Sequence, residues 1–167
     1  FSLKKTKIDF NIKKNFNILN HYLFELMKEL SLKVVSDGEG LSKLIKVKIL
    51  KSKSKKQAKK IAFAIVNSPL VKTAVTGEDA NWGRIIAAIG KTEEKILQDR
   101  VKIFFGNNLV CQKGSVYKKI NFSKLNYYMK NKLIEISVVL NSGDCDFTVY
   151  GNDLTYEYIR INADYRS

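Results

Sequence analysis

Two pairs of carboxylates are the side chains in this sequence best placed to do chemistry. Asp37 and Glu39 lie in a Gly-rich stretch, DGEG, and Glu78 and Asp79 follow directly after Gly77. A carboxyl group acts as a general acid or base when a second proton-transfer group lies beside it. The sequence offers neither pair such a partner, and it contains no Ser–His–Asp set and no phosphate-binding Gly loop. The residues alone therefore predict solvated acids in two turns.

The two cysteines and the one histidine do not form the pattern of a metal site. Cys111 and Cys145 are far apart, and His21 lies in a stretch with helical apolar spacing. Structural zinc sites bring cysteines together in short Cys-x-x-Cys or Cys/His spacings, which are missing here. We expect no metal, no other cofactor and no Cys–His nucleophile pair, and we predict that His21 packs or lies at a rim. Thiols without a pairing pattern favour a reducing, cytoplasmic setting.

Composition and charge limit the classes of protein to which this chain could belong. The chain has 167 residues, of which 45% are hydrophobic, and a net charge of +14. This hydrophobic content predicts a globular chain that can bury a core. The positive charge would attract phosphates, but it is almost all Lys, whereas base reading favours the planar guanidinium of Arg. We therefore expect no nucleic-acid partner. No apolar run is long enough to span a bilayer, so no membrane partner is expected.

Hydrophobic spacing predicts the helices that position these residues. Helical spacing covers 15–33, 55–66, the residues after Asn81, 121–130 and the residues after Asp153. Ser54, Asn81 and Asp153 precede three of these helices, where each side chain can cap the first turn. The apolar stripe of the first helix consists of Phe16, Leu19, Leu23, Leu26 and Leu30.

Alternating or β-branched runs predict the strands. They cover 1–12, 44–50, 70–75, 101–105, 109–112, 133–140 and 146–150. Gly106-Asn107-Asn108 separates the two strands of a hairpin, and Gly143 lies in the turn before the last strand. Helices that interleave with antiparallel hairpins predict an α+β fold.

Three long motifs in a fixed order link this chain to a known family. They are VVSDGEG (34–40), NSPLVKTAVTGEDANWGR (67–84) and NDLTYEYIRINADYRS (152–167). Together they resemble the ornithine acetyltransferases, also called glutamate N-acetyltransferases, of cyclic arginine biosynthesis. The resemblance runs from about Leu30 to Ser167, and the residues before it are compatible with the same family.

The resemblance implies a specific chemistry. Family members are similar to N-terminal-nucleophile proteins: a precursor cuts itself before a Thr, which then heads the second, β chain. The Thr hydroxyl is the nucleophile and its own α-amino group is the nearby base. Acetyl moves from N-acetylornithine to glutamate by a ping-pong route through an acetyl-Thr intermediate, and some members also accept acetyl-CoA.

The sequence departs from the family at its start. Position 1 is Phe, and each of the six Thr residues follows Lys, Val, Phe or Leu rather than a small residue. We therefore expect the nucleophile upstream of Phe1, so that this chain is the C-terminal part of the β chain and alone cannot form the acetyl-enzyme. The expected partner is the upstream, α chain of the same precursor, in a hetero-oligomer. Residues 1–50 would complete the α/β sandwich domain that carries the nucleophile, and 51–167 would form a small α+β domain.

Three positions carry the family's substrate contacts. Glu39 matches its acidic residue, and a carboxylate suits the ammonium group of a substrate. Asn162 and Ser167 match its C-terminal pair, whose amide and hydroxyl can hold the amino-acid portion by neutral hydrogen bonds. Read without the family, Asn162 is a helix-end amide and Ser167 a terminal residue.

Other positions of the motifs are assigned no chemistry. Glu78, Asp79, Trp82 and Arg84 are predicted to be structural or to pack between subunits. Smaller departures from the family pattern occur where Ala80 replaces Pro, Asn152 replaces Cys, and Ser167 replaces Thr.

Two other readings stay open. The first is a non-catalytic interaction domain that keeps the family fold without the nucleophile. The second is a basic nucleic-acid-binding module, whose binding would weaken steeply with salt.

Overall fold

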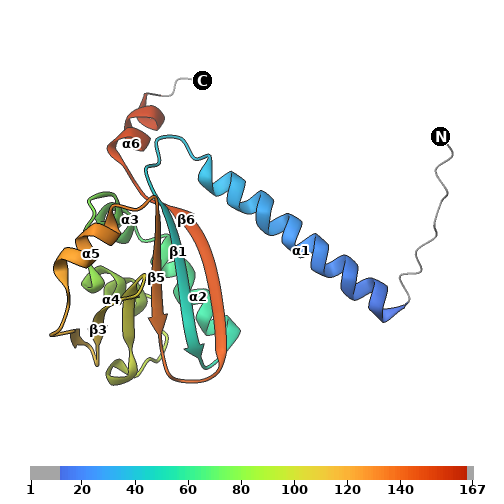
Figure 1. Ribbon diagram of the computed structural model, residues 1–167, viewed down its shortest axis with the longest axis horizontal. Coiled ribbons are helices and arrows are strands. Elements are labelled where there is room, and N and C mark those ends of the chain that lie inside the picture. The colour runs from blue at the N-terminus through green and yellow to red at the C-terminus, as the bar shows by residue number, and fades with distance from the viewer. Residues whose placement is uncertain (1–11, 165–167) are drawn as a thin grey trace. The chain divides into compact units, whose positions relative to one another are not determined.

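The computed structural model describes residues 12–164 (Figure 1). The strand predicted at the N-terminus falls almost wholly outside these residues, as does Ser167. The chain divides into two compact units, Phe1–Val34 and Val35–Ser167. Within residues 12–164, no helix combines the length and apolar character needed to cross a membrane.

The described part of the first unit is one long helix. Helix α1 runs from Lys13 to Ser36, which confirms the helix predicted over 15–33. A single helix cannot bury its own apolar stripe, and Phe16, Leu23 and Leu30 are all exposed. The stripe is therefore a face that needs a partner element.

A mixed six-stranded sheet forms the centre of the second unit. Its order is β4-β3-β2-β5-β1-β6, in which β1 pairs parallel with β5 and every other pairing is antiparallel. In Figure 1, β1 lies between β5 and β6. The strands are β1 (Leu44–Ser52), β2 (Lys102–Phe105), β3 (Asn108–Gln112), β4 (Ser115–Val116), β5 (Leu133–Val139) and β6 (Cys145–Asn152).

Helices cover one face of this sheet and build the core with it. They are α2 (Lys55–Val66), α3 (Pro69–Thr76), α4 (Trp82–Gly90) and α5 (Phe122–Met129). The covered face of the sheet carries Ile45, Val47 and Ile49 of β1 beside Ile134 and Ile136 of β5, all fully buried. A short 3₁₀ turn (Gln98–Arg100) and helix α6 (Tyr156–Ala163) complete the described elements.

Two predicted helix starts are confirmed. Ser54 Oγ accepts a hydrogen bond from Gln57 N at 3.1 Å, and α2 begins at the next residue. Asn81 Oδ1 accepts one from Arg84 N at 3.1 Å and caps α4 in the same way.

The strand predicted over 70–75 is wrong, because these residues form helix α3. Ser68 Oγ accepts a hydrogen bond from Val71 N, and Pro69 occupies the first helical position, where its missing N–H costs nothing. Val71, Ala74 and Val75 are buried at helical spacing. A short apolar run fits a strand or a buried helix equally well, and the cap residues decide for the helix.

The last two predicted strands are present but are not hairpin partners. Strand β1 lies between β5 and β6, and the turn that contains Gly143 passes around its end. Gly143 N and Ser142 N both donate to Lys51 O, at 3.1 and 2.8 Å. The α+β class is confirmed, with one parallel pair that local patterns do not reveal.

The second compact unit begins at Val35, before strand β1. Strand β1 belongs to the second unit because it pairs with both β5 and β6 along most of its length. A sandwich domain completed by residues 1–50 stays a prediction about a longer protein.

Candidate substrate-binding site

The DGEG stretch forms the connection between α1 and β1. It contains Glu39, which is exposed, between Gly38 and Gly40. Gly40 has φ +66°, and a Cβ atom there would lie 2.5 Å from the backbone N of Tyr158. A Cβ atom at Gly38 would lie 2.8 Å from Asn152 Nδ2. At Gly40 only glycine permits both the backbone conformation and the close approach of the Tyr158 backbone, whereas a Cβ atom at Gly38 would require the Asn152 side chain to move.

These contacts join the first and the last of the three sequence motifs. Thr155 Oγ1 donates a short hydrogen bond to Gly40 O and accepts one from Tyr158 N at 3.0 Å. The segment that holds Glu39 therefore packs directly against the first turn of α6. Figure 1 shows this connection passing the start of α6 before it enters β1.

Asp153 does not cap the last helix, contrary to the prediction. Thr155 is the N-cap of α6. Asp153 is instead buried, with 4% of its surface exposed, and its Oδ1 accepts from Ser42 N at 2.9 Å. Its Oδ2 accepts from Ser42 Oγ at 2.5 Å and from Thr76 Oγ1 at 3.1 Å. The carboxylate thus holds the end of the DGEG connection to helix α3.

Helix α3 contributes two polar side chains to this region that sequence reasoning missed. Thr76 Oγ1 also lies 2.9 Å from Leu154 O, and Lys72 Nζ donates to Asn152 Oδ1 at 3.1 Å. Burial lowers the pKa of Lys72, and the nearby Asp153 carboxylate opposes that shift. The available signal was the spacing of Lys72 and Thr76, four residues apart in SPLVKTAVTG, which places them on one face of a helix and equally on one face of a strand.

Asn162 lies on α6, six residues after the helix begins at Tyr156. It is exposed, and its Nδ2 donates to Tyr158 O at 2.9 Å. Tyr158, whose backbone N faces Gly40, lies four residues before Asn162, so Asn162 is about one helical turn, roughly 6 Å, along from the segment that contacts the DGEG stretch. Ser167 is outside the described residues. The structure therefore joins Glu39 to the start of α6 and leaves its relation to the other two predicted residues a prediction.

The second carboxylate pair has structural contacts. Glu78 forms an ion pair with Lys43, and Asp79 Oδ2 accepts from Asn81 Nδ2 at 2.9 Å. Arg84 Nη1 donates to Leu70 O at 2.8 Å, which fixes α4 to α3. Trp82 packs, half-buried, against the core. These contacts agree with the structural role predicted for the motif.

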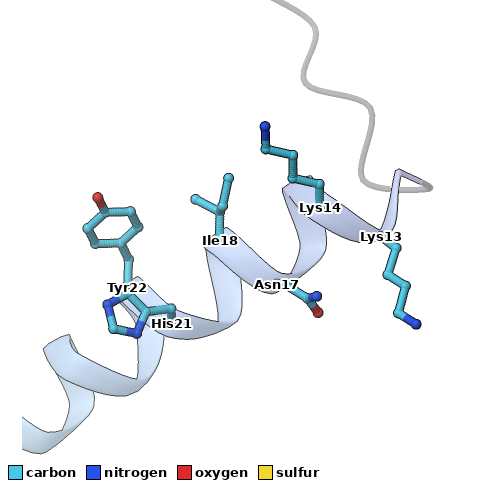
Figure 2. Close-up of a pocket in the computed structure, with 6 residues that line it drawn as sticks. All are labelled: Lys13, Lys14, Asn17, Ile18, His21 and Tyr22. Atoms are coloured by element: carbon cyan, nitrogen blue, oxygen red, sulfur yellow. The ribbon is translucent and has the colours of Figure 1, made fainter.

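A shallow pocket lies along α1, far in sequence from these residues. Figure 2 shows its lining side chains: Lys13, Lys14, Asn17, Ile18, His21 and Tyr22. All six come from one helix, on the side opposite the apolar stripe, so the described residues supply a single wall. Between residues 12 and 164, no group of three or more His, Cys, Asp or Glu side chains gathers as metal ligands would. We assign this pocket no chemistry.

Comparison with known proteins identifies the family of this chain. Residues 3–167 match the model of the ArgJ family, so the chain belongs to that family. This confirms the resemblance to the ornithine acetyltransferases drawn from the three motifs.

The named relatives are longer than this chain. It is 47% identical over 145 residues to the arginine biosynthesis bifunctional protein ArgJ of Brucella melitensis, covering 87% of this chain and 35% of that protein. It is 40% identical over 142 residues to the protein of that name from Caulobacter vibrioides, covering 85% and 35%. The chain thus spans about a third of the length of these relatives.

A solved structure has the same fold. The crystal structure of arginine biosynthesis bifunctional protein ArgJ from Bacillus halodurans superposes with a TM-score of 0.84 at 34% sequence identity. The match covers 90% of this chain and 71% of that one.

Proposed function

We propose that this chain is the C-terminal part of a glutamate N-acetyltransferase that moves acetyl from N-acetylornithine to glutamate. The transfer passes through an acetyl-Thr whose Thr belongs to the upstream part of the β chain. The product, N-acetylglutamate, is regenerated without acetyl-CoA, although acetyl-CoA remains an additional candidate donor.

The observation that carries the proposal is the contact between the DGEG connection and the start of α6. Family membership supports the chemistry, and the bond from Thr155 to Gly40 O holds together the first and the last of the three motifs, which we propose bind substrate. Two segments far apart in sequence that pack together at Gly40, where the backbone leaves no room for a side chain, support a shared site.

In this mechanism the residues of this chain bind and orient the substrate. The Glu39 carboxylate holds the ammonium group by a charge-assisted hydrogen bond. The Asn162 amide and the Ser167 hydroxyl hold the amino-acid portion. The upstream Thr hydroxyl attacks the acetyl carbonyl, ornithine leaves, and the α-amino group of glutamate then takes the acetyl from the Thr ester.

The uncovered apolar stripe of α1 supports the proposed partner. Its residues Leu19, Leu23 and Leu26 are exposed, and the matched 145 residues make up only 35% of the relative from Brucella melitensis. We assign the upstream chain as the element that covers the stripe, in a cytoplasmic hetero-oligomer.

The proposal is tested with the complete gene product. Purified protein is incubated with N-acetylornithine and glutamate, and the formation of ornithine and N-acetylglutamate is followed. We expect stoichiometric transfer with parallel double-reciprocal plots, as a ping-pong route requires. If no transfer occurs in a folded product, the chain is instead an interaction domain with the family fold.

A further inference from the structure

The long motif NSPLVKTAVTGEDANWGR includes α3, and none of its residues is among the predicted substrate contacts. Helix α3 is nevertheless hydrogen-bonded to the residues that hold the connection containing Glu39. Thr76 Oγ1, at the end of α3, lies 3.1 Å from Asp153 Oδ2, and its single proton is shared between this carboxylate, Leu154 O at 2.9 Å and Lys72 O at 3.1 Å. Asp153 in turn accepts from both the N–H and the hydroxyl of Ser42, at 2.9 and 2.5 Å. Ser42 closes the connection in which Glu39 lies.

The bonds fix the connection at both ends. Asp153 N donates to Lys43 O at 3.1 Å, so the backbone of β6 and that of the connection are joined beside the carboxylate. Three residues earlier, Gly40 O accepts from Thr155, and Gly38 packs against Asn152. Asn152, Asp153 and Thr155 thus contact the connection on both sides of Glu39.

Asp153 is buried, and its carboxylate oxygens accept hydrogen bonds from Ser42 and Thr76 in this region. A buried carboxylate costs free energy unless it is fully hydrogen-bonded, and Ser42 N, Ser42 Oγ and Thr76 Oγ1 supply the donors. A carboxylate held in this way selects one backbone conformation of its partners, because other conformations leave it unpaired.

We propose that Asp153, supported by Thr76 of α3, is a positioning residue that sets the place of the Glu39 carboxylate in the substrate site. The inference rests on the proposed function, in which Glu39 binds the substrate ammonium. In this inference the SPLVKTAVTG motif, which forms α3, holds the substrate-binding connection in place through Asp153.

The test is a double-mutant cycle in the complete enzyme. Asp153→Asn keeps the volume and one oxygen but loses an acceptor, and Thr76→Val keeps the shape without the hydroxyl. We expect each to raise the KM for N-acetylornithine, on the order of tenfold for Asp153→Asn and less for Thr76→Val, with kcat within about twofold. In a Glu39→Gln background, both effects on KM shrink to less than about twofold, because residues that act through one another are not additive.

Ser54→Ala is the matched control. It removes a helix cap and some stability at the opposite end of β1, roughly 30 Å away at about 3.3 Å per residue over the 9 residues of the strand. We expect this variant to lower thermal stability and to leave the KM for N-acetylornithine unchanged.

The outcomes separate this inference from the proposed function. If Glu39→Gln raises KM but Asp153→Asn and Thr76→Val do not, or if their effects are undiminished in the Glu39→Gln background, the positioning role is overturned. If Glu39→Gln itself leaves KM unchanged, the proposed substrate contact fails and the positioning role fails with it. If Asp153→Asn does not fold, the KM of Thr76→Val for N-acetylornithine, with and without Glu39→Gln, decides whether the positioning role holds.

Discussion

The ammonium group of Lys43 lies 3.1 Å from Oε1 of Glu78, although Lys43 is buried with 7% of its surface exposed. Lys43 Nζ also donates to Met129 O at 2.9 Å and to Asn131 O at 3.3 Å. One side chain at the start of β1 thus joins the turn after α3 to the C-terminal end of α5. A cation at that end of α5 also complements the helix dipole.

The first prediction concerns the stability that this contact provides. Lys43→Met fills the same space but leaves the buried Met129 carbonyl and the partly buried Asn131 carbonyl without this donor, so it should lower the free energy of unfolding by about 1–3 kcal/mol. Glu78→Gln removes only a half-exposed ion pair and should cost less than about 1 kcal/mol. Urea unfolding of both variants measures the difference. Equal losses would show that the ion pair, and not the carbonyl bonds, holds Lys43.

The second prediction concerns stability in acid. Glu135 lies on the open face of the sheet between Lys46 Nζ at 3.1 Å and Lys48 Nζ at 2.8 Å. Burial raises the pKa of Glu135, but the hydrogen bonds from Lys48 and Lys46 outweigh it and hold that pKa below its ordinary value of 4.5. A carboxylate with a lowered folded-state pKa stabilises the protein above its unfolded pKa, and this stability is lost as pH falls through the folded value.

The free energy of unfolding should therefore fall between about pH 5 and pH 3 more steeply in the wild type than in Glu135→Gln. Urea unfolding at a series of pH values measures the two slopes. Glu93→Gln, at an exposed position, serves as the control and should keep the wild-type slope. If Glu135→Gln also keeps it, the two lysines do not stabilise the ionised carboxylate.

The third prediction concerns the apolar stripe of α1. Leu23→Glu places a charge in the stripe and should reduce recovery of the assembled protein from the complete gene product at least severalfold, because a buried unpaired carboxylate is costly. Asn17→Glu adds the same charge on the opposite side of the helix and should assemble normally. Size-exclusion chromatography quantifies both. Normal assembly of Leu23→Glu would remove the stripe from the subunit contact.

The fourth prediction concerns what Glu39 recognises. N-acetylnorvaline has the carbon chain of N-acetylornithine without its terminal ammonium group. The wild-type enzyme should prefer N-acetylornithine in kcat/KM, and Glu39→Gln should lose most of that preference, since the lost interaction is between a carboxylate and an ammonium. Initial rates with the two donors give the ratio. An unchanged ratio in Glu39→Gln would place the ammonium contact elsewhere.

Local patterns predicted the elements whose ends are fixed by their own residues. Ser54 and Asn81 cap the first turn of the helices that follow them, so sequence located both starts. The hairpin of β2 and β3 was equally local, since Gly106 has φ +56° in the short turn between them. The strand prediction over 70–75 was wrong, because an apolar run of this length fits a strand or a helix equally well.

Local sequence patterns could not predict pairings between strands that are far apart in sequence. The insertion of β1 between β5 and β6 depends on contacts between residues far apart in sequence, which no local spacing encodes. Asp153 looked like a helix cap because it precedes α6, but its partners Ser42 and Thr76 lie 111 and 77 residues away. The motifs identified the family from sequence alone, whereas the hydrogen-bond network around the connection that contains Glu39 could be recognised only in the three-dimensional structure.

The central claim is that acetyl is carried on a Thr upstream of this chain. Mass spectrometry of the complete, purified gene product, with and without N-acetylornithine and in the absence of glutamate, tests it most directly. The account predicts a Thr-initiated chain that contains residues 1–167 and gains one acetyl group, which glutamate then removes. A product that gains no acetyl, or gains it at a residue of this chain, would contradict the account.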